Sequence, residues 1–333
     1  MMYGIAAPLV WTLEKLGRSE RLFAGLRKGQ LRRLAAKNPF AGYVPSSHDV
    51  FIATFAKSGT NWMMQIVHQL LFHGQGEFDH IHDVVPWPDM NSAGPMRRYA
   101  IPLEDPAVWM ASPEHRRVIK THFDWEMIPY SDDARYITVI RDPKDVLVSS
   151  YFFFVKSGML RAVMPSSDLW YRLFLSDRFP VGGSWVANTA GYWAQRHRPN
   201  VLVLSFKSMK RDLRGTVIQV AKFLNLQLPD AVLDEVCRKS SFEYMRQIDR
   251  KFAPWKMAPF GAPASMMRKG TQGGSSELLS PQRQCDVDAY CMAELKRLGS
   301  DFPYEEFCDV GPGIIEESEV RIQNAVRHHH SGF

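Results

Sequence analysis

VFIATFAKSGTNW, residues 50–62, decides the fold: an apolar run enters a short polar loop and leaves as the start of an amphipathic helix. The nearly continuous apolar run Val50–Phe55 is typical of a buried parallel strand. The apolar residues from Trp62 onward recur at helical spacing, and Gly74 marks the end of that helix. Because the first backbone N–H groups of a helix have no partner within it, they attract anions, and Lys57 adds a positive charge there. The stretch therefore predicts an α/β fold with a phosphate or sulfate site.

The pattern of strand followed by helix recurs along the chain. Arg117–Lys120, Tyr136–Ile140 and Val201–Phe206 are further strand candidates. The pair Asp142-Pro143 supplies an N-cap and a proline at the first helical position, and the helix that follows is expected to run to about Val155. We predict an α/β fold made of a single domain, with a central parallel sheet flanked by helices.

Three parts of the chain differ in composition. Residues 1–40 are basic and are expected to form a helical arm, and residues 41–310 hold the predicted domain. Residues 311–333 are expected to be a flexible tail, because residues 316–333 have no apolar period. Three adjacent histidines in it (residues 328–330) are better explained by a disordered end than by a metal site. The proline-rich segment 246–267 is expected to be a lid or binding loop.

Composition places the chain among ordinary globular proteins. Of its 333 residues, 45% are apolar and 23% are charged, which suits one large α/β domain. The four cysteines show no CxxC pair, which argues against a disulfide framework or a zinc site and favours a reducing compartment. No apolar run reaches the roughly 18 residues needed to cross a bilayer. The apolar stretch at residues 5–13 precedes the positive charges, the reverse of a signal peptide. We predict a cytoplasmic protein.

Positive charge is concentrated at the N-terminus. Residues 1–40 hold eight Lys and Arg against two Glu, which accounts for the whole net charge of +6. The remaining chain is balanced, unlike the basic surface of a nucleic-acid-binding protein. Leucines and Phe23 lie among these charges, so the segment could lie on an anionic membrane surface. The alternative is a helical arm packed on the domain with a solvated basic face.

The loop at Lys57 differs from the Walker A motif, in which Lys and Ser/Thr follow a glycine at a fixed spacing from an earlier glycine. Here residue 53 is alanine, and the lysine comes before Ser-Gly-Thr. The strand before the loop and the helix after it favour an anion site over a plain turn.

A second segment with candidate chemistry is Val118–His122, at the end of a predicted strand. In open α/β sheets ligands bind beyond the carboxyl ends of the strands, which would bring Lys120 and His122 near the Lys57 loop. A histidine suits deprotonation of a hydroxyl near neutral pH. A purely structural, hydrogen-bonding histidine is the alternative.

Two further segments could hold an anion. Arg141 ends a predicted strand and Ser149 lies two turns into the next helix, so a guanidinium and a hydroxyl could form a second phosphate site. The alternative is a salt bridge from Arg141 to a carboxylate, and Asp142 and Asp145 fit helix capping better than Mg²⁺ binding. Residues 268–270, Arg-Lys-Gly, place two cations beside flexible backbone, with a solvated basic turn as the alternative.

These four segments, in this order, resemble the motifs of the cytosolic-type sulfotransferase family, whose members transfer a sulfuryl group from PAPS to a hydroxyl or amine. FAKSGTNW is similar to the family's 5′-phosphosulfate loop, VIKTHF to its Lys-Thr-His strand, YITVIRDPKDVLVSSYFFF to its 3′-phosphate strand and helix, and RKGTQGG to its C-terminal loop. Gly183-Ser184-Trp185 and Ser240-Ser241-Phe242 match further landmarks. The resemblance spans about residues 48–300. It implies a P-loop-like nucleotide-binding fold and an enzyme that needs no metal.

The resemblance implies a role for each matching residue. His122 would be the general base, Lys120 would stabilise the sulfuryl group in transfer, and Lys57 would neutralise charge on the leaving bridging oxygen. The groups expected on the 5′-phosphate are Ser58, Gly59, Thr60 and Asn61. The groups expected on the 3′-phosphate are Arg141, Ser149, Arg268, Lys269 and Gly270. The residues expected around the adenine are Trp62, Phe206, Ser240 and Phe242. Transfer of a charged group needs such positioning, positive charge and a base.

The sequence departs from the family pattern at several positions. Asn61 stands where a second threonine is common, and Phe206 where a tyrosine is often found, so one hydrogen bond to the adenine would be lost. The family's Gly-Asp-Trp-Lys continuation is replaced by Gly-Gly-Ser-Ser at residues 273–276. The dimer signature that follows is also missing, with Ser280-Pro281 in its middle. We therefore expect a monomer, or a dimer that does not use the family's usual short C-terminal motif.

The favoured hypothesis is a PAPS-dependent sulfotransferase that acts on an apolar small-molecule or lipid-like acceptor, with PAP as product and no nucleic acid as partner. Candidates for the acceptor pocket are Phe152, Phe153, Phe154, Trp87, Trp125, Met159, Met257, Met266 and Met267. One alternative is a P-loop-like kinase that uses ATP and Mg²⁺, against which the missing Walker A motif counts. Another is a non-catalytic nucleotide-binding scaffold docked on a membrane through residues 1–40.

Overall fold

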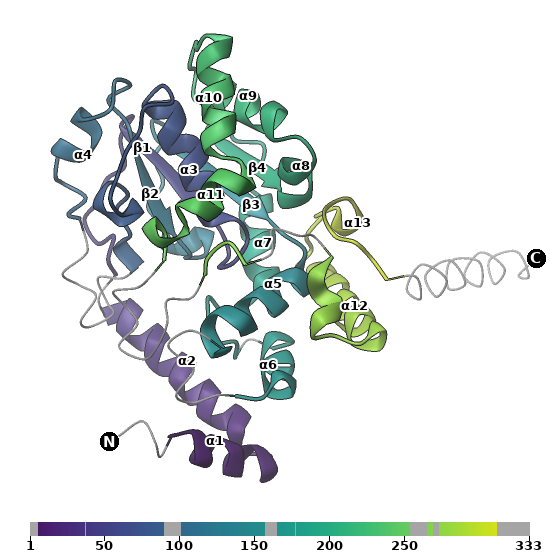
Figure 1. The fold of residues 1–333 in the computed structure, drawn as a ribbon. Helices are drawn as coiled ribbons and strands as arrows, with labels where there is room; N and C mark the ends of the chain where they lie inside the picture. The colour runs from purple at the N-terminus through teal and green to yellow at the C-terminus, as the bar shows by residue number, and fades with distance from the viewer. Residues whose placement is uncertain are drawn as a thin grey trace, which may run out of the picture.

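A computed structural model of the chain describes residues 6–36, 38–89, 101–156, 165–176, 178–253, 265–268 and 273–311. The strands of this part of the chain form one parallel sheet in the order β2-β1-β3-β4 (Figure 1). They are β1 (Asp49–Ala53), β2 (Arg117–Thr121), β3 (Arg135–Ile140) and β4 (Val201–Ser205). Each of the predicted strands is present, with ends shifted by one or two residues.

Helices precede, separate and follow the strands (Figure 1). The arm before β1 holds α1 (Ala6–Lys15) and α2 (Ser19–Ala36). Between β1 and β2 lie α3 (Thr60–Leu71), η1 (Ile81–Asp83) and α4 (Ala107–Met110), and between β2 and β3 lies η4 (Trp125–Met127). Between β3 and β4 lie α5 (Pro143–Ser150), η5 (Tyr151–Lys156), α6 (Ser167–Phe174) and α7 (Trp185–Trp193). After β4 come α8 (Phe206–Arg211), α9 (Leu213–Phe223), α10 (Asp230–Lys239), α11 (Phe242–Gln247), η6 (Asp249–Lys251), η8 (Gly274–Glu277), α12 (Pro281–Arg297) and α13 (Tyr304–Phe307).

The central strand β1 is buried along its whole length. Val50 and Ile52 pack into a core cluster with α3, α9 and α10, whereas Phe51 belongs to the cluster on the other face of the sheet. There the Phe51 ring stacks on Tyr136 of β3, with ring centres 5.0 Å apart. Burial on both faces explains why the sequence shows a continuous apolar run instead of an alternating one. The predicted fold class, a central parallel sheet flanked by helices, is confirmed.

Helix boundaries near the sheet follow from local sequence. After α3, Gly74 has a φ of 78° and donates its N–H to the Gln69 carbonyl over 2.7 Å, as a C-terminal glycine does. Before α5, the Asp142 carboxylate accepts a hydrogen bond from the Lys144 amide over 2.9 Å. Both the helix end and the N-cap expected from the sequence are therefore present.

The helix expected to run to about Val155 is present, but it is α-helical only in its first part. The α-helix ends at Ser150, and the chain continues as the π-helix η5. The wider turn of a π-helix changes which side chains face the core, and such segments are frequent at functional sites. Here Val155 stays buried, whereas Phe153 and Phe154 line the cavity described below.

A buried ion network ties α5 to α12. Lys144 pairs with the Asp288 carboxylate and lies 3.2 Å from an oxygen of Asp142, and all three residues are buried. Tyr304 donates its hydroxyl to Asp288 over 2.8 Å. Removing one member of such a network would leave a buried charge unpaired, which is strongly unfavourable. The network thereby fixes the start of α5 and, just before it, Arg141.

The N-terminal arm packs on the rest of the chain. Phe23 of α2 and Val10 of α1 are 1% and 2% exposed and belong to the core cluster that includes α5 and α6. Figure 1 shows α2 running beside α6, where Glu20 pairs with Arg172 over 3.1 Å. These contacts fit the packed-arm alternative, while basic residues such as Lys28 stay exposed. None of the described helices combines the length and the apolar character that crossing a bilayer requires.

Candidate active site

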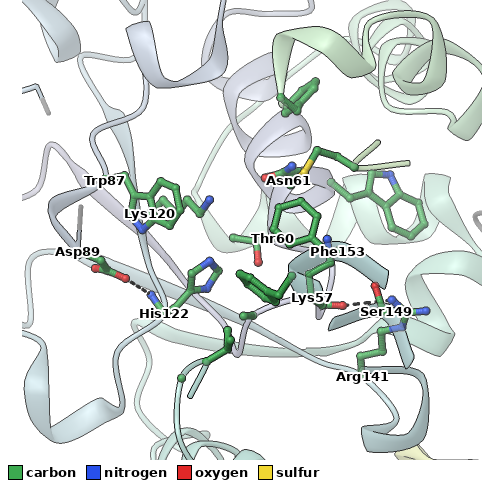
Figure 2. Close-up of a pocket in the computed structure, with 18 of the residues that line it drawn as sticks. Lys57, Thr60, Asn61, Trp87, Asp89, Lys120, His122, Arg141, Ser149 and Phe153 are labelled. Carbon is green, nitrogen blue, oxygen red and sulfur yellow. Dashed lines mark hydrogen bonds between the residues drawn. The ribbon is translucent and has the colours of Figure 1, made fainter. Parts of the chain in front are cut away.

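A cavity of about 900 Å³ lies where the carboxyl ends of the strands meet (Figure 2). It is lined by Lys57 after β1, by Lys120 at the end of β2, by Arg141 after β3 and by Phe206 after β4. The predicted site residues that line it are Lys57, Gly59, Thr60, Asn61, Trp62, Lys120, His122, Arg141, Ser149, Phe206, Phe242 and Arg268. The structure thus brings together segments that are far apart in the sequence.

Two predicted site residues, Ser58 and Ser240, do not line the cavity. Ser58 and Ser240 are fully buried behind the cavity wall, and their hydroxyl oxygens have no hydrogen-bond partner among the described residues. Lys269 and Gly270 lie outside the residues that the structure describes.

The loop before α3 has the backbone of an anion site. Lys57 has a φ of 70°, a conformation that costs roughly 1–2 kcal/mol in a residue other than glycine. Gly59 follows with a φ of 101°, and a Cβ atom on it would lie 2.8 Å from the Phe206 ring. Glycine is therefore required there for both conformation and space. No side chain of the described residues caps α3, so the N–H groups of its first turn remain for an anion.

The Lys57 ammonium lies 3.8 Å from the centre of the Phe153 ring. Burial, helped by the positive charges of Arg141 and Arg268, lowers the pKa of Lys57 to about 7, while the charge of Asp249 opposes this shift. Arg141 Nη1 donates to the Lys57 carbonyl over 3.1 Å (Figure 2). At neutral pH Lys57 is therefore divided between its charged and neutral forms, and a bound anion would favour the charged form.

Lys120 is the second lysine of the cavity. The residue is only 4% exposed, and its ammonium lies 3.4 Å from the centre of the Trp87 ring. Burial and the charge of Lys57 lower the pKa of Lys120 to about 7, against the opposing charge of Asp89. Because the ammonium meets the face of a ring, its charge remains available to an anionic ligand.

His122 follows β2 and is held from two sides. Its Nδ1 lies 2.9 Å from the Thr54 carbonyl oxygen, which can only accept, so Nδ1 carries the proton and Nε2 keeps its lone pair. Its backbone N–H donates to the Asp89 carboxylate over 2.7 Å (Figure 2), and Trp87 stands perpendicular to the ring at 5.6 Å. Burial and the nearby charge of Lys120 lower the pKa of His122 to about 3. The side chain is therefore a neutral imidazole with one unprotonated nitrogen.

Two residues that line the cavity near His122 were not predicted from the sequence. Asp89 accepts the Thr121 hydroxyl over 2.8 Å in addition to the His122 amide, and burial raises the pKa of Asp89 against these hydrogen bonds. His82 stacks on Trp87 with ring centres 5.0 Å apart. Both belong to the irregular segment between α3 and α4, in which no motif marks them, and Trp87 is the local signal that could have drawn attention to it.

Arg141 has donor capacity to spare. Its Nη2 donates to Asp145 over 3.4 Å, so the salt bridge considered as the alternative is present. Its Nε, however, is buried without a partner among the described residues. Arg268 also lines the cavity but donates twice to Glu277, over 2.8 and 2.7 Å. An anion could therefore bind Arg141 directly, whereas Arg268 would have to exchange Glu277 for it.

Aromatic rings form the wall next to the Lys57 loop. The Trp62 indole N–H donates to the Ser240 carbonyl over 2.8 Å, and the Trp62 and Phe206 rings meet at 70° with centres 5.6 Å apart. Phe242 completes this wall. Such flat apolar surfaces suit a stacked base.

The proposed acceptor residues are only partly at the cavity. Phe153, Phe154, Trp87, Met266 and Met267 line it. Trp125 does not: it is partly buried and packs edge-on against Tyr136 and Tyr192, at the margin of the aromatic core cluster. Phe152 lies under Arg268 at 4.3 Å instead. Met159 and Met257 lie outside the described residues.

Helix α2 forms a wall that the sequence does not predict. It contributes Gly25, Leu26, Arg27, Gly29, Gln30 and Leu34. Within the described ranges, no group of three or more His, Cys, Asp and Glu is arranged to hold a metal ion.

Comparison with known proteins identifies relatives of this chain. A family model described as "Sulfotransferase domain" matches residues 47–299. Sulfotransferase 2A6 of Mus musculus is 30% identical over 235 residues, which cover 69% of this chain and 78% of that protein. Sulfotransferase 2A1 of Homo sapiens is 26% identical over 288 residues, which cover 84% of this chain and 94% of that protein.

Solved structures share the fold at low sequence identity. Retinol dehydratase in complex with retinol and PAP matches with a TM-score of 0.65 and 19% identity, covering 83% of this chain and 88% of that one. Mouse sulfotransferase SULT7A1 complexed with PAP matches with a TM-score of 0.57 and 20% identity, covering 78% and 88%.

Proposed function

We propose that this chain, which belongs to the sulfotransferase family, transfers a sulfuryl group from PAPS to a hydroxyl or amine of an apolar small-molecule or lipid-like acceptor and releases PAP. One observation carries the proposal: Lys57, Lys120 and His122 line a single cavity beside an uncapped helix N-terminus. The presence of PAP in two similar solved structures, in one of them together with retinol, supports it.

The residues of the cavity suit a donor with two phosphate groups. Lys57 and the first-turn amides of α3 fit one anion. Ser149 and the guanidinium of Arg141, which both line the cavity, fit a second. Trp62 and Phe206, whose rings meet edge to face, together offer a ring surface against which the adenine can lie. PAPS, when bound, supplies the sulfuryl group that is transferred.

His122 acts as the general base. Its Nε2 accepts the hydroxyl proton as the acceptor oxygen forms a bond to sulfur and the bond from sulfur to the bridging phosphate oxygen breaks. Lys57 neutralises the charge that develops on this bridging oxygen, and Lys120 stabilises the sulfuryl oxygens. Thr54 keeps the proton of the imidazole on Nδ1, so that Nε2 stays free to accept.

The charge state of His122 links donor binding to catalysis. Without an anion, burial and the neighbouring cations hold the pKa of His122 near 3, which makes it a weak base. The negative charges of a bound donor offset those of Lys57 and Lys120, so the pKa of His122 rises towards the range useful for proton transfer. The base is thereby activated when the donor is in place.

A cytoplasmic location is part of the proposal, and so is peripheral membrane contact through the solvent-facing side of the packed N-terminal arm, within residues 1–40. Arg21 and Lys28 are exposed on the same arm as Trp11 and Leu16, which are 49% and 61% exposed. This mixture suits an anionic lipid surface. Binding to anionic vesicles that is lost at high salt would support the contact, and equal binding to neutral vesicles would contradict it.

A monomer, or a dimer built differently from the family's usual one, is the proposed assembly. Ser280 caps α12 through its hydroxyl and Pro281 occupies the first turn of that helix, so these residues start a helix where the dimer signature would lie. The oligomeric state in solution, measured by light scattering, tests this proposal.

The function is tested by sulfate transfer from labelled PAPS to a panel of phenols, sterols and long-chain alcohols. We expect transfer to at least one apolar alcohol, unchanged by EDTA. Phosphate transfer from ATP and Mg²⁺ would instead favour the kinase alternative. Binding of PAP without transfer to any acceptor would favour the scaffold alternative.

A further inference from the structure

Helix α2 is the part of the cavity that the donor site does not explain. Its lining residues run from Gly25 to Leu34, which is roughly 13 Å of helix at 1.5 Å per residue. They belong to the N-terminal arm, ahead of residues 47–299 that the family model matches. The arm is thus both a packed element and a wall of the cavity.

Two glycines of α2 have no structural reason to be glycine. Gly25 and Gly29 lie one turn apart inside the helix, where glycine is disfavoured relative to alanine. Neither has a positive φ, and a Cβ atom on either would have no protein atom within 4 Å among the described residues. Gly59 shows the contrast, because a Cβ atom there would meet Phe206 at 2.8 Å. Since both glycines line the cavity, the open space beside them is part of the cavity and is available to a bound ligand.

The surroundings of α2 show what kind of molecule would fit. Leu26 lines the cavity while 55% exposed, and Phe154 and Val181 line it from other elements. Two polar side chains of α2, Arg27 and Gln30, also line the cavity, and Arg27 donates to Gln30 over 3.1 Å. Apart from these two side chains, the wall offers apolar side chains and bare helix backbone to a ligand.

We propose that α2 is the acceptor-binding wall, and that the acceptor is an elongated apolar alcohol whose body lies against the backbone at Gly25 and Gly29 while its hydroxyl reaches His122. The inference rests on the proposed function for the reaction itself. Binding of such an alcohol is separable from turnover, so the two can fail independently.

The test measures binding of all-trans-retinol, as a probe alcohol, to the full-length protein in the presence of PAP by retinol fluorescence. Gly29→Leu fills the space beside α2, and we expect retinol affinity to fall at least tenfold. Lys28→Leu is the matched control, because Lys28 is exposed on the same helix and does not line the cavity. It should change the affinity less than twofold. Thermal unfolding and PAP binding check both variants, and Gly25→Ala with Gly29→Ala is a milder pair if leucine prevents folding.

Turnover separates the inference from the proposed function. With Gly29→Leu, the ratio of retinol transfer to p-nitrophenol transfer should fall at least tenfold, whereas Lys28→Leu should leave both rates within about twofold of wild type. Equal retinol affinity in wild type and Gly29→Leu, equal losses in both leucine variants, or no retinol binding by the wild type would overturn the role of α2. A wild type that binds retinol as expected but transfers no sulfate to any acceptor would refute the proposed function and leave this inference standing.

Discussion

The two sides of the cavity are assembled in different ways. The proposed donor side, which we define as the Lys57 loop with Arg141 and Ser149, comes from two strand-to-helix connections: the Lys57 loop and Arg141 follow β1 and β3, and Ser149 lies in the helix after Arg141. The acceptor side, defined as α2, Trp87 with its neighbouring segment and the π-helix η5, is gathered from distant parts of the chain. Charged groups and backbone amides dominate the first side, and apolar side chains dominate the second.

This difference shows which property each side needs. An anion is held by groups whose positions the backbone fixes, such as the uncapped start of α3 and the strained loop before it. An apolar molecule is held by shape and burial, which many combinations of side chains can provide. His122 and Lys120 lie between the two sides. A substitution of either should therefore change turnover more than it changes PAP affinity.

The largest effect is expected for His122→Ala. Loss of the general base should lower turnover by about 10³-fold or more, while PAP affinity stays within about twofold because no donor contact is removed. His82→Ala is the matched control, since His82 also lines the cavity and also places its Nδ1 3.0 Å from a backbone carbonyl, that of Val85. Its turnover should fall by less than tenfold. Retained activity in His122→Ala would refute the assignment of the base.

The next effect tests the donor side through its lysine. Lys57→Ala should lower turnover by about 10²-fold, the usual cost of losing one preorganised positive group at a developing charge. It should also weaken PAP binding, because Lys57 faces the anion site in the ground state as well. Lys120→Ala should lower turnover with a smaller loss of PAP affinity. Single-turnover kinetics and calorimetric titration with PAP measure the two quantities, and unchanged kinetics in Lys57→Ala would remove this residue from the site.

Much of the donor side could be predicted from the sequence because its residues are tied to local structure. The order of strand, loop and helix around Lys57 and the Asp142-Pro143 helix start are local signals, and both appear in the structure. The gathering of Lys120 and His122 near that loop followed from the rule that ligands bind at the carboxyl ends of parallel strands. A single sequence predicts a site best where the site is built from continuous segments whose backbone conformation the local sequence determines.

The acceptor side could not be predicted in the same way. Asp89 and His82 come from an irregular segment, and their positions depend on tertiary contacts with β2 and Trp87. The change from the α-helix α5 to the π-helix η5 cannot be read from the spacing of apolar residues in the sequence. Trp125 illustrates the opposite error, because its aromatic character fits a core as well as a binding site. Apolar composition indicates burial but not whether a protein side chain or a ligand completes it.

A smaller effect is expected from adding one methyl group to the anion loop. Gly59→Ala introduces both an unfavourable φ and a contact with Phe206, so we expect it to cost about 2–3 kcal/mol of stability and to weaken PAP binding about tenfold. Gly42→Ala is the matched control, because Gly42 has a φ of 79° and open space around its Cβ position. It should cost about 1 kcal/mol and leave PAP affinity unchanged. Chemical denaturation and PAP titration measure both quantities, and equal PAP affinity in the two variants would show that the close approach to Phe206 is irrelevant to the anion site.

The smallest effect is the pH dependence of donor-side binding. Burial places the pKa of Lys57 near 7 in the free protein, and a bound anion raises it by favouring the ammonium. Binding therefore takes up a proton wherever the free lysine is neutral, so PAP affinity must fall as pH rises above 7. For one such group the loss of PAP affinity is about fivefold between pH 7 and pH 8.

This pH range lies above the second ionisation of a phosphate, near pH 6, so the ligand itself keeps its charge. Titration in buffers of different ionisation enthalpy measures the proton uptake, and Lys57→Gln should reduce it. If the proton uptake is the same in that variant, the proton goes to another group. Lys120, whose pKa is also about 7, would then be the next residue to replace.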